Sequence, residues 1–356
     1  MHFINHTNLT AITDTYYSIY PNKKNLEKIY CFFDEIQVVS GWEVYIERLL
    51  RTENCEIVII GSSAKMLSRE IATQMRGRSL SWEIFPFSFL EFLRSNNIDV
   101  RKSINSPQKC ILTNLFDKYF KIGGFAEVQN VSDRDRVKIH QEYFRSVLFR
   151  DIIERYNLNH PKAILYLAHH LIDSIGQLYS INRLVNFLKT AGYKTSKTFV
   201  SEIVDLFEDA YFLFTVRKYD ESHQKQQVNP KKVYCIDHAL VNSVSSGINE
   251  NEGALLENLA FLYLRRLYSE IYYYKTTKDQ EVDFLVIPSK GSKFLVQICK
   301  SIQNEKTRKR ELSSIATAMA ELQVEKCILL TLNEYEEIQL STGIVSVMPI
   351  WKYILN

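Results

Sequence analysis

The run Ile29-Tyr-Cys-Phe-Phe-Asp34-Glu35 decides how the front of the chain folds. Five apolar residues in succession indicate a buried strand, and the two acidic residues mark its carboxyl end. Apolar residues at helical spacing follow over 41–50, and Glu56-Ile-Val-Ile-Ile60 is a second apolar run, which ends in Gly61-Ser-Ser63. Strand, helix and strand in this order predict a parallel α/β sheet.

The composition of the whole chain is that of a folded protein with more than one domain. Gly and Pro account for 11 and 7 of the 356 residues, which excludes collagen-like and low-complexity disordered chains. This length predicts two or three domains. Because 44 Lys and Arg residues are balanced by 41 Asp and Glu residues, the net charge is only +3. Any binding of nucleic acid must therefore be local.

The cysteines and the apolar segments predict a cytoplasmic protein. The six cysteines lie far apart, with no C-x-x-C pair, so neither a disulfide framework nor a zinc site is indicated. No apolar run approaches the roughly 18 residues that span a bilayer. The amino-terminal residues lack the basic and apolar regions of a signal peptide. We therefore expect buried thiols in a reducing compartment and no contact with a membrane.

The acidic pair Asp34-Glu35 has the form of a Walker B motif. In such a motif the Asp holds a Mg²⁺-bound water and the Glu polarises the water that attacks the γ-phosphate. Alternatively, acidic residues gather wherever a strand leaves the core, and a bare apolar run followed by Asp-Glu favours that interpretation. Ser62 after the second strand, and Arg76 and Arg78 further on, favour the nucleotide site, because a polar residue and a positive charge are expected beside the γ-phosphate.

On these residues the chain resembles the prokaryotic AAA-type ATPases that carry a C-terminal domain of unknown function with a restriction-endonuclease-like fold. The resemblance implies ATP and Mg²⁺ as cofactors, Asp34 and Glu35 as the Walker B pair, with Asp34 orienting Mg²⁺, and Ser62 as the sensor residue. It covers almost the full length and rests on the segments 32–43, 61–73, 76–78, 85–92, 256–258 and 281–284.

The P-loop of such ATPases is missing from the sequence. A P-loop has the form G-x-x-x-x-G-K-[ST], in which backbone N–H groups wrap the phosphates and the Lys holds them. None of the 11 glycines supplies this motif. The resemblance places the P-loop strand upstream, next to the strand Glu56–Ile60, so we expect an amino-terminally truncated member, through a mis-assigned start or a true gene fragment. Such a chain would have an unpaired strand edge and would not hydrolyse ATP.

Residues 161–240 predict a winged helix, because three helices are followed by a β-hairpin. The third helix, near 197–209, would lie in a major groove of DNA. Basic residues at the hairpin tip, Lys225, Lys231 and Lys232 among them, would contact phosphates. The local excess of positive charge is small, so a module that packs against or binds a protein partner is an equal alternative.

The last block carries part of a nuclease-like constellation. Nucleases of the restriction-endonuclease-like class need an Asp on one strand and a Glu two residues before a Lys on the next. Asp283 and Lys300 fit, and Glu257 adds a carboxylate, but Ile298 stands at the Glu position and Gln297 points to the other face. An apolar residue leaves the shell of a hard cation incomplete. We expect a degenerate site that retains the fold and has lost cleavage.

The predicted fold is α/β and multidomain. Residues 1–100 form a partial AAA-type parallel sheet, 101–160 a helical lid, 161–240 a winged helix and 241–356 an endonuclease-like α/β domain. The predicted function is that of an AAA-type ATP-binding protein without ATP hydrolysis. The alternative is a non-catalytic winged-helix and endonuclease-like module that binds DNA or a protein. The sequence leaves the oligomeric state open.

Overall fold

The computed structural model describes residues 6–24, 28–61, 79–100, 106–245 and 251–355. The chain divides into two compact units, which are described separately. The front unit contains residues 1–83 together with 209–211, and the main unit contains residues 84–208 and 212–356. None of the described helices is both long and apolar enough to cross a bilayer.

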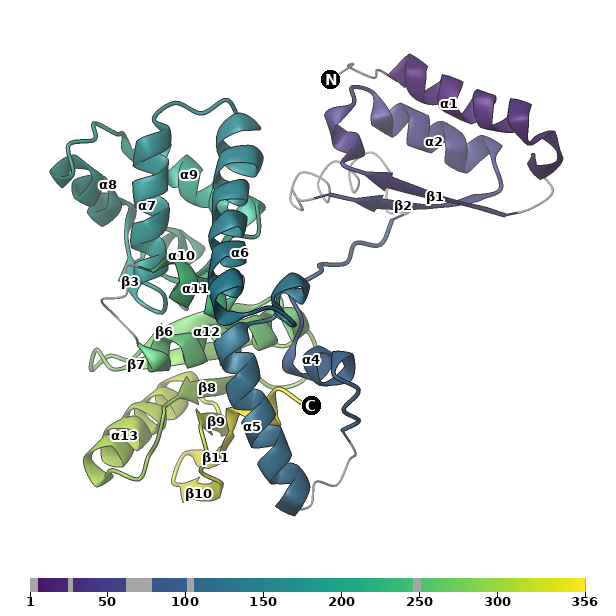
Figure 1. Cartoon of the computed structure of the whole chain (residues 1–356). Coiled ribbons are helices and arrows are strands. Elements are labelled where there is room, and N and C mark those ends of the chain that lie inside the picture. Colours follow the sequence, from purple (N-terminus) through teal and green to yellow (C-terminus); the bar gives the residue numbers. More distant parts are fainter. Residues whose placement is uncertain (1–5, 25–27, 62–78, 101–105, 246–250, 356) are drawn as a thin grey trace. The chain divides into compact units, whose positions relative to one another are not determined.

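The front unit is a small α/β layer. Strands β1 and β2 pair in parallel, in a register that runs from Ile29 opposite Cys55 to Asp34 opposite Ile60. Both long helices, α1 and α2, lie on the same side of this sheet (Figure 1). The parallel α/β arrangement predicted for this part of the chain is therefore present. The described elements are α1 (His6–Ile19), η1 (Pro21–Lys23), β1 (Ile29–Asp34), η2 (Ile36–Val38), α2 (Trp42–Thr52) and β2 (Cys55–Ile60).

Side chains along both strands of the front unit alternate between a covered and an exposed face. Phe33 and Ile57 pack on a core that Trp42, Ile46 and other residues of α1 and α2 provide. The opposite face exposes large apolar side chains, with Phe32 69 % exposed. Parallel sheets normally bury both faces. The described residues of the front unit thus cover only one face of an apolar sheet.

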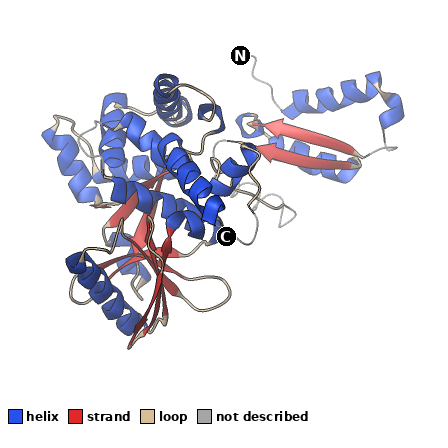
Figure 2. Ribbon diagram, turned by 60° about the horizontal axis from the view of Figure 1, so that its bottom comes forward, coloured by secondary structure: helices blue, strands red, loops and turns tan. Residues whose placement is uncertain are grey.

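The main unit is built from helices around one large sheet (Figure 2). The first helix, α4, begins at a capping box, in which Ser88 and Glu91 satisfy each other's backbone N–H groups. The described helical elements of this unit are α4 (Phe89–Ser95), α5 (Ser106–Ile122), η3 (Ala126–Val128), α6 (Asp133–Ser146), the π-helix η4 (Val147–Glu154), α7 (Pro161–Asp173), α8 (Ile181–Thr190), α9 (Lys197–Asp209), α10 (His223–Val228), α11 (His238–Val244), α12 (Glu252–Leu267), α13 (Glu305–Leu322) and α14 (Ile350–Tyr353).

One nine-stranded mixed sheet runs through the main unit, in the order β10-β11-β9-β8-β7-β6-β4-β5-β3. The strand β4 pairs antiparallel with β5 and also parallel with β6, through Arg217 opposite Tyr272. The predicted winged-helix segment and the predicted C-terminal domain therefore share a single sheet. The strands are β3 (Leu178–Tyr179), β4 (Leu213–Lys218), β5 (Lys231–Cys235), β6 (Ile271–Lys275), β7 (Glu281–Val286), β8 (Phe294–Ile298), β9 (Lys326–Thr331), β10 (Glu336–Leu340) and β11 (Gly343–Pro349).

The segment from 161 to 240 has three helices, α7, α8 and α9, followed by the hairpin β4–β5, with β3 adding a short third strand to β5. The hairpin differs from the predicted one at its tip, where the polar residues form the helix α10 (Figure 1). The prediction for Lys232 is wrong: its side chain is 1 % exposed. It does not reach solvent at a tip because it is engaged with carboxylates from β7 and α12.

The segment 85–92, which the sequence assigns to the first 100 residues, belongs to the main unit in the structure. Phe89 and Phe92 are buried there and pack on Tyr119 of α5. The residues 80–84 just before it form no strand. The physical division of the chain thus comes before this aromatic segment, because its phenylalanines complete the core of the main unit.

Candidate functional site

The first candidate site is the end of the two parallel strands in the front unit. Asp34 is the last residue of β1 and lies opposite Ile60, the last residue of β2. Because the strands are parallel, both carboxyl ends meet at one edge, with Gly61 directly after β2. Ligands of open α/β sheets bind at that edge. The predicted acidic pair therefore lies at the carboxyl edge of the two described strands.

Glu35 has an unusual backbone conformation at this edge. Its φ of 50° lies in the left-handed region, which few residues other than glycine adopt. Its backbone N–H donates to the carbonyl oxygen of Ile60 at 2.9 Å. The Glu35 carboxylate in turn accepts a hydrogen bond from the side chain of Gln37. Because six other described residues that are not glycine also have a positive φ, this conformation does not by itself mark a functional site.

Ser62, Arg76 and Arg78, the other residues predicted for this site, lie outside the described residues. Their roles as sensor and as charge stabilisers stay predictions.

The residues at this edge fit Mg²⁺, but they do not fit the triphosphate of ATP. Mg²⁺ is bound through carboxylate oxygens and waters, and the exposed Asp34 carboxylate at the strand end suits that chemistry. A triphosphate needs a cradle of backbone N–H groups and a lysine, and the 356 residues contain no such motif. We derive no hydrolytic step from these side chains.

The second candidate site is a buried ionic cluster in the main unit. The Lys232 ammonium, on β5, lies 2.7 Å from Oε1 of Glu257 on α12. It also lies 2.7 Å from Oε1 of Glu281 and 3.0 Å from Oδ1 of Asp283, both on β7. The structure thus brings together two of the three residues of the predicted degenerate site, Glu257 and Asp283, around a lysine that the sequence analysis assigned elsewhere.

Further hydrogen bonds fix the carboxylates of this cluster. The Tyr234 hydroxyl donates to Oε1 of Glu257 at 2.7 Å. The backbone N–H of Ile298 donates to Oδ2 of Asp283 at 2.9 Å. Gly176, with a φ of +75°, passes so close to Glu257 that a Cβ there would lie 3.3 Å from Oε2. The oxygens are therefore held in place by backbone and by side chains on several elements.

Gln297 does not replace the missing acid. Its Oε1 accepts from the backbone N–H of Asp283 at 3.1 Å, and its Nε2 donates to Glu311 at 2.9 Å. It therefore supports the strand that carries Asp283 rather than joining the carboxylates.

Lys300, the third residue of the predicted site, is engaged elsewhere. Its side chain is 60 % exposed, and its ammonium pairs with Glu252 at the start of α12. Among the described residues, no ion pair links Lys300 to Asp283 or Glu257. The cation that meets these two carboxylates is Lys232 instead.

The charges in the cluster follow from burial and proximity. Burial by itself would lower the pKa of Lys232, but the tyrosine and the three carboxylates around it raise that pKa well above its ordinary value. Burial, reinforced by the negative charge of Asp283, raises the pKa of the Glu257 carboxyl to about 7, although the hydrogen bonds from Lys232 and Tyr234 oppose the rise. Lys232 is thus charged near neutral pH, and burial favours the protonated form of Glu257.

The sequence carried one signal for Lys232 that the analysis missed. Residues 231–235 alternate, so that Lys232 and Tyr234 lie on the same face of one strand. A tyrosine is usually found with one end buried, and a lysine beside it on that face is a candidate for burial with a partner. Its partners could not be named, because they lie 25 to 51 residues away.

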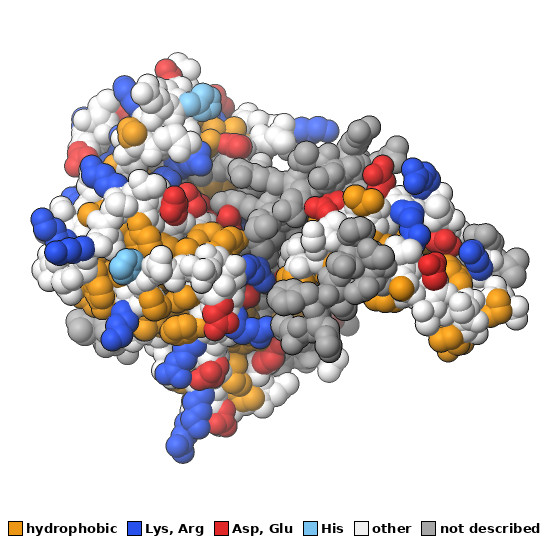
Figure 3. Space-filling model, turned by 90° about the horizontal axis from the view of Figure 1, so that it is seen from above, with side chains coloured by type: hydrophobic (Ala, Val, Ile, Leu, Met, Phe, Trp, Pro, Cys, Tyr) orange, Lys and Arg blue, Asp and Glu red, His pale blue; other side chains and the backbone are white. Residues whose placement is uncertain are grey.

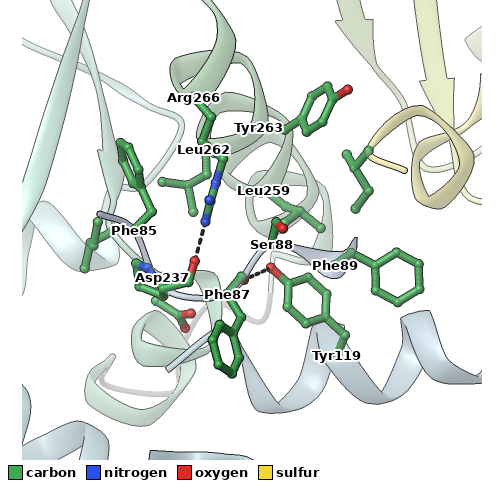
Figure 4. A pocket seen from close by; sticks show the side chains of 13 residues that line it. Phe85, Phe87, Ser88, Phe89, Tyr119, Asp237, Leu259, Leu262, Tyr263 and Arg266 are labelled. Carbon is green, nitrogen blue, oxygen red and sulfur yellow. Dashed lines mark hydrogen bonds between the residues drawn. The ribbon is translucent and has the colours of Figure 1, made fainter. Parts of the chain in front are cut away.

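A small cavity lies beneath the aromatic segment that joins the main unit (Figure 4). The Arg266 guanidinium donates to the backbone carbonyl of Pro86, and the Tyr119 hydroxyl donates to that of Phe87 at 2.8 Å. The carbonyl of Gly124 also accepts from the Phe87 N–H, at 2.6 Å. The cavity volume of about 20 Å³ suffices for a single water. It is a packing gap under a docked segment rather than a ligand pocket.

Comparison with protein families divides the chain into three matches. Residues 2–93 match the family described as "AAA domain". Residues 113–252 match a domain of unknown function (DUF8612), and residues 252–353 match another (DUF4143). The AAA match includes both strands of the front unit and the acidic pair at their end.

Two curated proteins are similar over much of the chain. An uncharacterised protein of Methanocaldococcus jannaschii is 34 % identical over 345 residues, which is 94 % of this chain and 75 % of that protein. An uncharacterised protein of Haemophilus influenzae is 32 % identical over 244 residues, and the chain spans only 59 % of its length.

One solved structure is similar at low level. The alignment covers 84 % of this chain and 75 % of a chain from an assembly of Thermococcus gammatolerans McrB AAA+ hexamers with bound McrC. The identity is 9 % and the TM-score 0.23, too low to indicate a shared fold.

Proposed function

We propose a function from one premise: the chain belongs to the family of the Methanocaldococcus jannaschii protein with which it shares 34 % identity over 94 % of its length. The chain is an AAA-type, ATPase-like protein. Its front unit keeps the Mg²⁺-binding end of a nucleotide site, and the 356 residues do not hydrolyse ATP by themselves.

The observation that supports this proposal is the shared carboxyl end of β1 and β2. Asp34 closes β1 there and Glu35 follows it in a left-handed conformation. The match to the AAA domain, residues 2–93, spans these elements. An acidic pair at this edge of a parallel sheet has a natural ligand in a Mg²⁺ ion that accompanies a phosphate group.

The same residues explain why hydrolysis is not expected. The Glu35 carboxylate can polarise a water only if a γ-phosphate is held beside it. Most of that holding comes from the P-loop backbone and its lysine, which the 356 residues lack. Weak, Mg²⁺-dependent contact with nucleotide without turnover is the expected behaviour.

The test is a titration of the full chain with a fluorescent ATP analogue, with and without Mg²⁺. We expect weak binding that needs Mg²⁺ and is lost in Asp34→Asn. Asp14→Asn is the matched control, because Asp14 is an exposed aspartate on α1 of the same unit. The absence of any binding would favour the alternative below.

A second candidate function is a non-catalytic module in which the main unit binds DNA. Exposed basic residues gather at the ends of α8 and α9 and in the turn between them, and they are Arg183, Lys189, Lys194 and Lys197. Opposing them, Glu202 and Asp205 are exposed further along α9. Lys, Arg, Asp and Glu side chains are likewise interspersed on the face shown in Figure 3. Such a patch gives weak, salt-sensitive binding at most.

Fluorescence anisotropy of a labelled duplex tests this second candidate. The double variant Lys194→Ala/Lys197→Ala should weaken binding several-fold and reduce its salt dependence. The control Lys118→Ala/Lys121→Ala removes two exposed lysines from α5 instead. Equal weakening in both variants, or no binding by the unaltered chain, contradicts a DNA-binding role for this turn.

A further inference from the structure

Three carboxylates and one ammonium meet inside the main unit, and they come from distant parts of the chain. Lys232 belongs to the hairpin strand β5, whereas Glu257 comes from α12, and Glu281 and Asp283 come from β7. The Lys232 side chain is 1 % exposed and that of Asp283 11 % exposed. A buried charge of this kind is costly unless it is paired and hydrogen-bonded, and this one is both.

The oxygen atoms around the Lys232 ammonium resemble the donors of a hard cation. Ca²⁺ takes carboxylate oxygens at about 2.3–2.6 Å in a flexible geometry. The three oxygens nearest Lys232 Nζ lie at 2.7, 2.7 and 3.0 Å. A contraction of a few tenths of an ångström would therefore suit an ion of that size. Among the described residues, no group of His, Cys, Asp and Glu is arranged to hold a metal as the chain stands.

We propose that the Lys232 ammonium is the built-in cation of this cluster, closing it to divalent metal and locking the hairpin strand β5 to α12 and β7. The degenerate nuclease-like site thus differs from a metal site in two ways: one acid is missing, and a lysine stands in the place of the metal ion. Its two remaining carboxylates, Glu257 and Asp283, both pair with the ammonium of a lysine from a neighbouring part of the chain. This inference does not depend on the proposed nucleotide site, because it concerns only the main unit.

The ion pairs of Lys232 reinforce the shared sheet of the main unit. β5 joins β4, and β4 continues into β6 and β7, so the strands that carry Lys232 and Asp283 belong to one sheet. The ammonium adds direct links from β5 to β7 and to α12. The Tyr234 hydroxyl, two residues along the same strand, adds another link to Glu257. The segments predicted as winged helix and C-terminal domain should consequently unfold together.

The test removes the built-in cation and offers a metal in its place. The full chain and its Lys232→Ala variant are melted with and without millimolar Ca²⁺. The unaltered chain should melt at the same temperature in both conditions. Lys232→Ala should melt lower without Ca²⁺ and recover by about 3 °C or more with it, as expected when an ion binds only the folded state.

Two further variants show where the ion binds. Lys232→Ala/Asp283→Asn should lose the Ca²⁺ response, because it removes one carboxylate ligand. Lys231→Ala is the matched control, since Lys231 is the neighbouring lysine of β5, and its melting temperature should not respond to Ca²⁺.

Several results would overturn the proposal. One is a Ca²⁺ response of Lys232→Ala no larger than that of Lys231→Ala. Another is calorimetric binding of Ca²⁺ to the unaltered chain that Asp283→Asn abolishes, since the site would then be open to metal with Lys232 in place. If Lys232→Ala is unfolded in buffer, folding on addition of Ca²⁺ supports the proposal, and remaining unfolded contradicts it.

Discussion

Among the described residues, strands of the same apolar character are covered on one face in the front unit and on both faces in the main unit. Every residue of β7 after Glu281 is buried, whereas β1 alternates and leaves Tyr30 61 % exposed. The main unit supplies α13 on one face and α12 near the other, together with neighbouring strands on both sides of β7. An apolar run predicts that a strand needs cover, but it does not tell whether the rest of the chain supplies that cover.

The largest expected effect on stability comes from comparing one substitution in each of the two sheets. Leu285 on β7 is completely buried, so Leu285→Ala should lower the free energy of unfolding of the main unit by about 3 kcal/mol. Phe32→Ser on β1 should change the stability of the front unit by less than about 1 kcal/mol and improve solubility, because Phe32 is exposed.

Urea unfolding followed by tryptophan fluorescence distinguishes these two variants. Trp351 is buried in the main unit, whereas Trp42 and the exposed Trp82 belong to the front unit. A Trp42→Phe/Trp82→Phe background therefore reports the main unit alone, and a Trp351→Phe background reports the front unit. A large loss of stability in Phe32→Ser would mean that the exposed face of β1 is covered in solution.

The buried Glu257 carboxyl should make the stability of the main unit depend on pH. The Glu257 carboxyl has a folded-state pKa of about 7, raised above its unfolded value, so its protonated form stabilises the fold. That contribution is complete below about pH 4.5 and is lost as the pH rises through 7. The expected loss is on the order of 3 kcal/mol.

Glu257→Gln should remove this contribution, because the amide does not ionise. The difference in slope between Glu257→Gln and the unaltered chain isolates it from the histidines of the main unit, whose pKa values burial lowers and which therefore favour the fold as the pH rises: His140, His169, His170 and His238. The measurement is the urea midpoint of the Trp351 transition between pH 4.5 and 8. Glu252→Gln, which changes an exposed glutamate at the start of the same helix, should keep the slope of the unaltered chain. If Glu257→Gln gained stability relative to the unaltered chain as the pH falls, Lys232 would stabilise the Glu257 anion more than burial disfavours it.

The smallest effect is expected at Lys300, which the sequence placed in the nuclease-like site. Its pair with Glu252 is exposed on both sides, and such pairs contribute less than about 0.5 kcal/mol. Lys300→Ala should therefore leave the stability of the main unit unchanged in the same urea experiment. If Lys300→Ala lowered the free energy of unfolding as much as Lys232→Ala does, Lys300 would have to interact with the buried carboxylates.

Local patterns in the sequence predicted the two strands of the front unit and the helix between them, but not the helix α1. The runs Ile29–Asp34 and Cys55–Ile60 are strands, with α2 between them, because each pattern depends on residues close in sequence. The same patterns placed the segment 85–92 with the front sheet. An apolar residue does not reveal which core it will join, and Phe89 joins Tyr119 of the main unit.

The buried cluster shows the other limit of sequence reasoning. Asp283 and Glu257 could be named as carboxylates of one site because a known pattern links them. Lys232 could not, because its position depends on β4 pairing with both β5 and β6, a register that no local pattern sets. The parallel contact between β4 and β6 is what brings the hairpin lysine toward β7.

Hydrogen exchange of the backbone amides of β2 and β7 in the monomer tests the central contrast most directly. We expect much weaker protection at 56–60 than at 282–286, because β2 pairs with a single described strand and one face of that pair is exposed. Limited proteolysis should correspondingly leave a resistant fragment that begins near residue 84. Equal protection of the two strands would contradict the account and would mean that another element completes the front sheet.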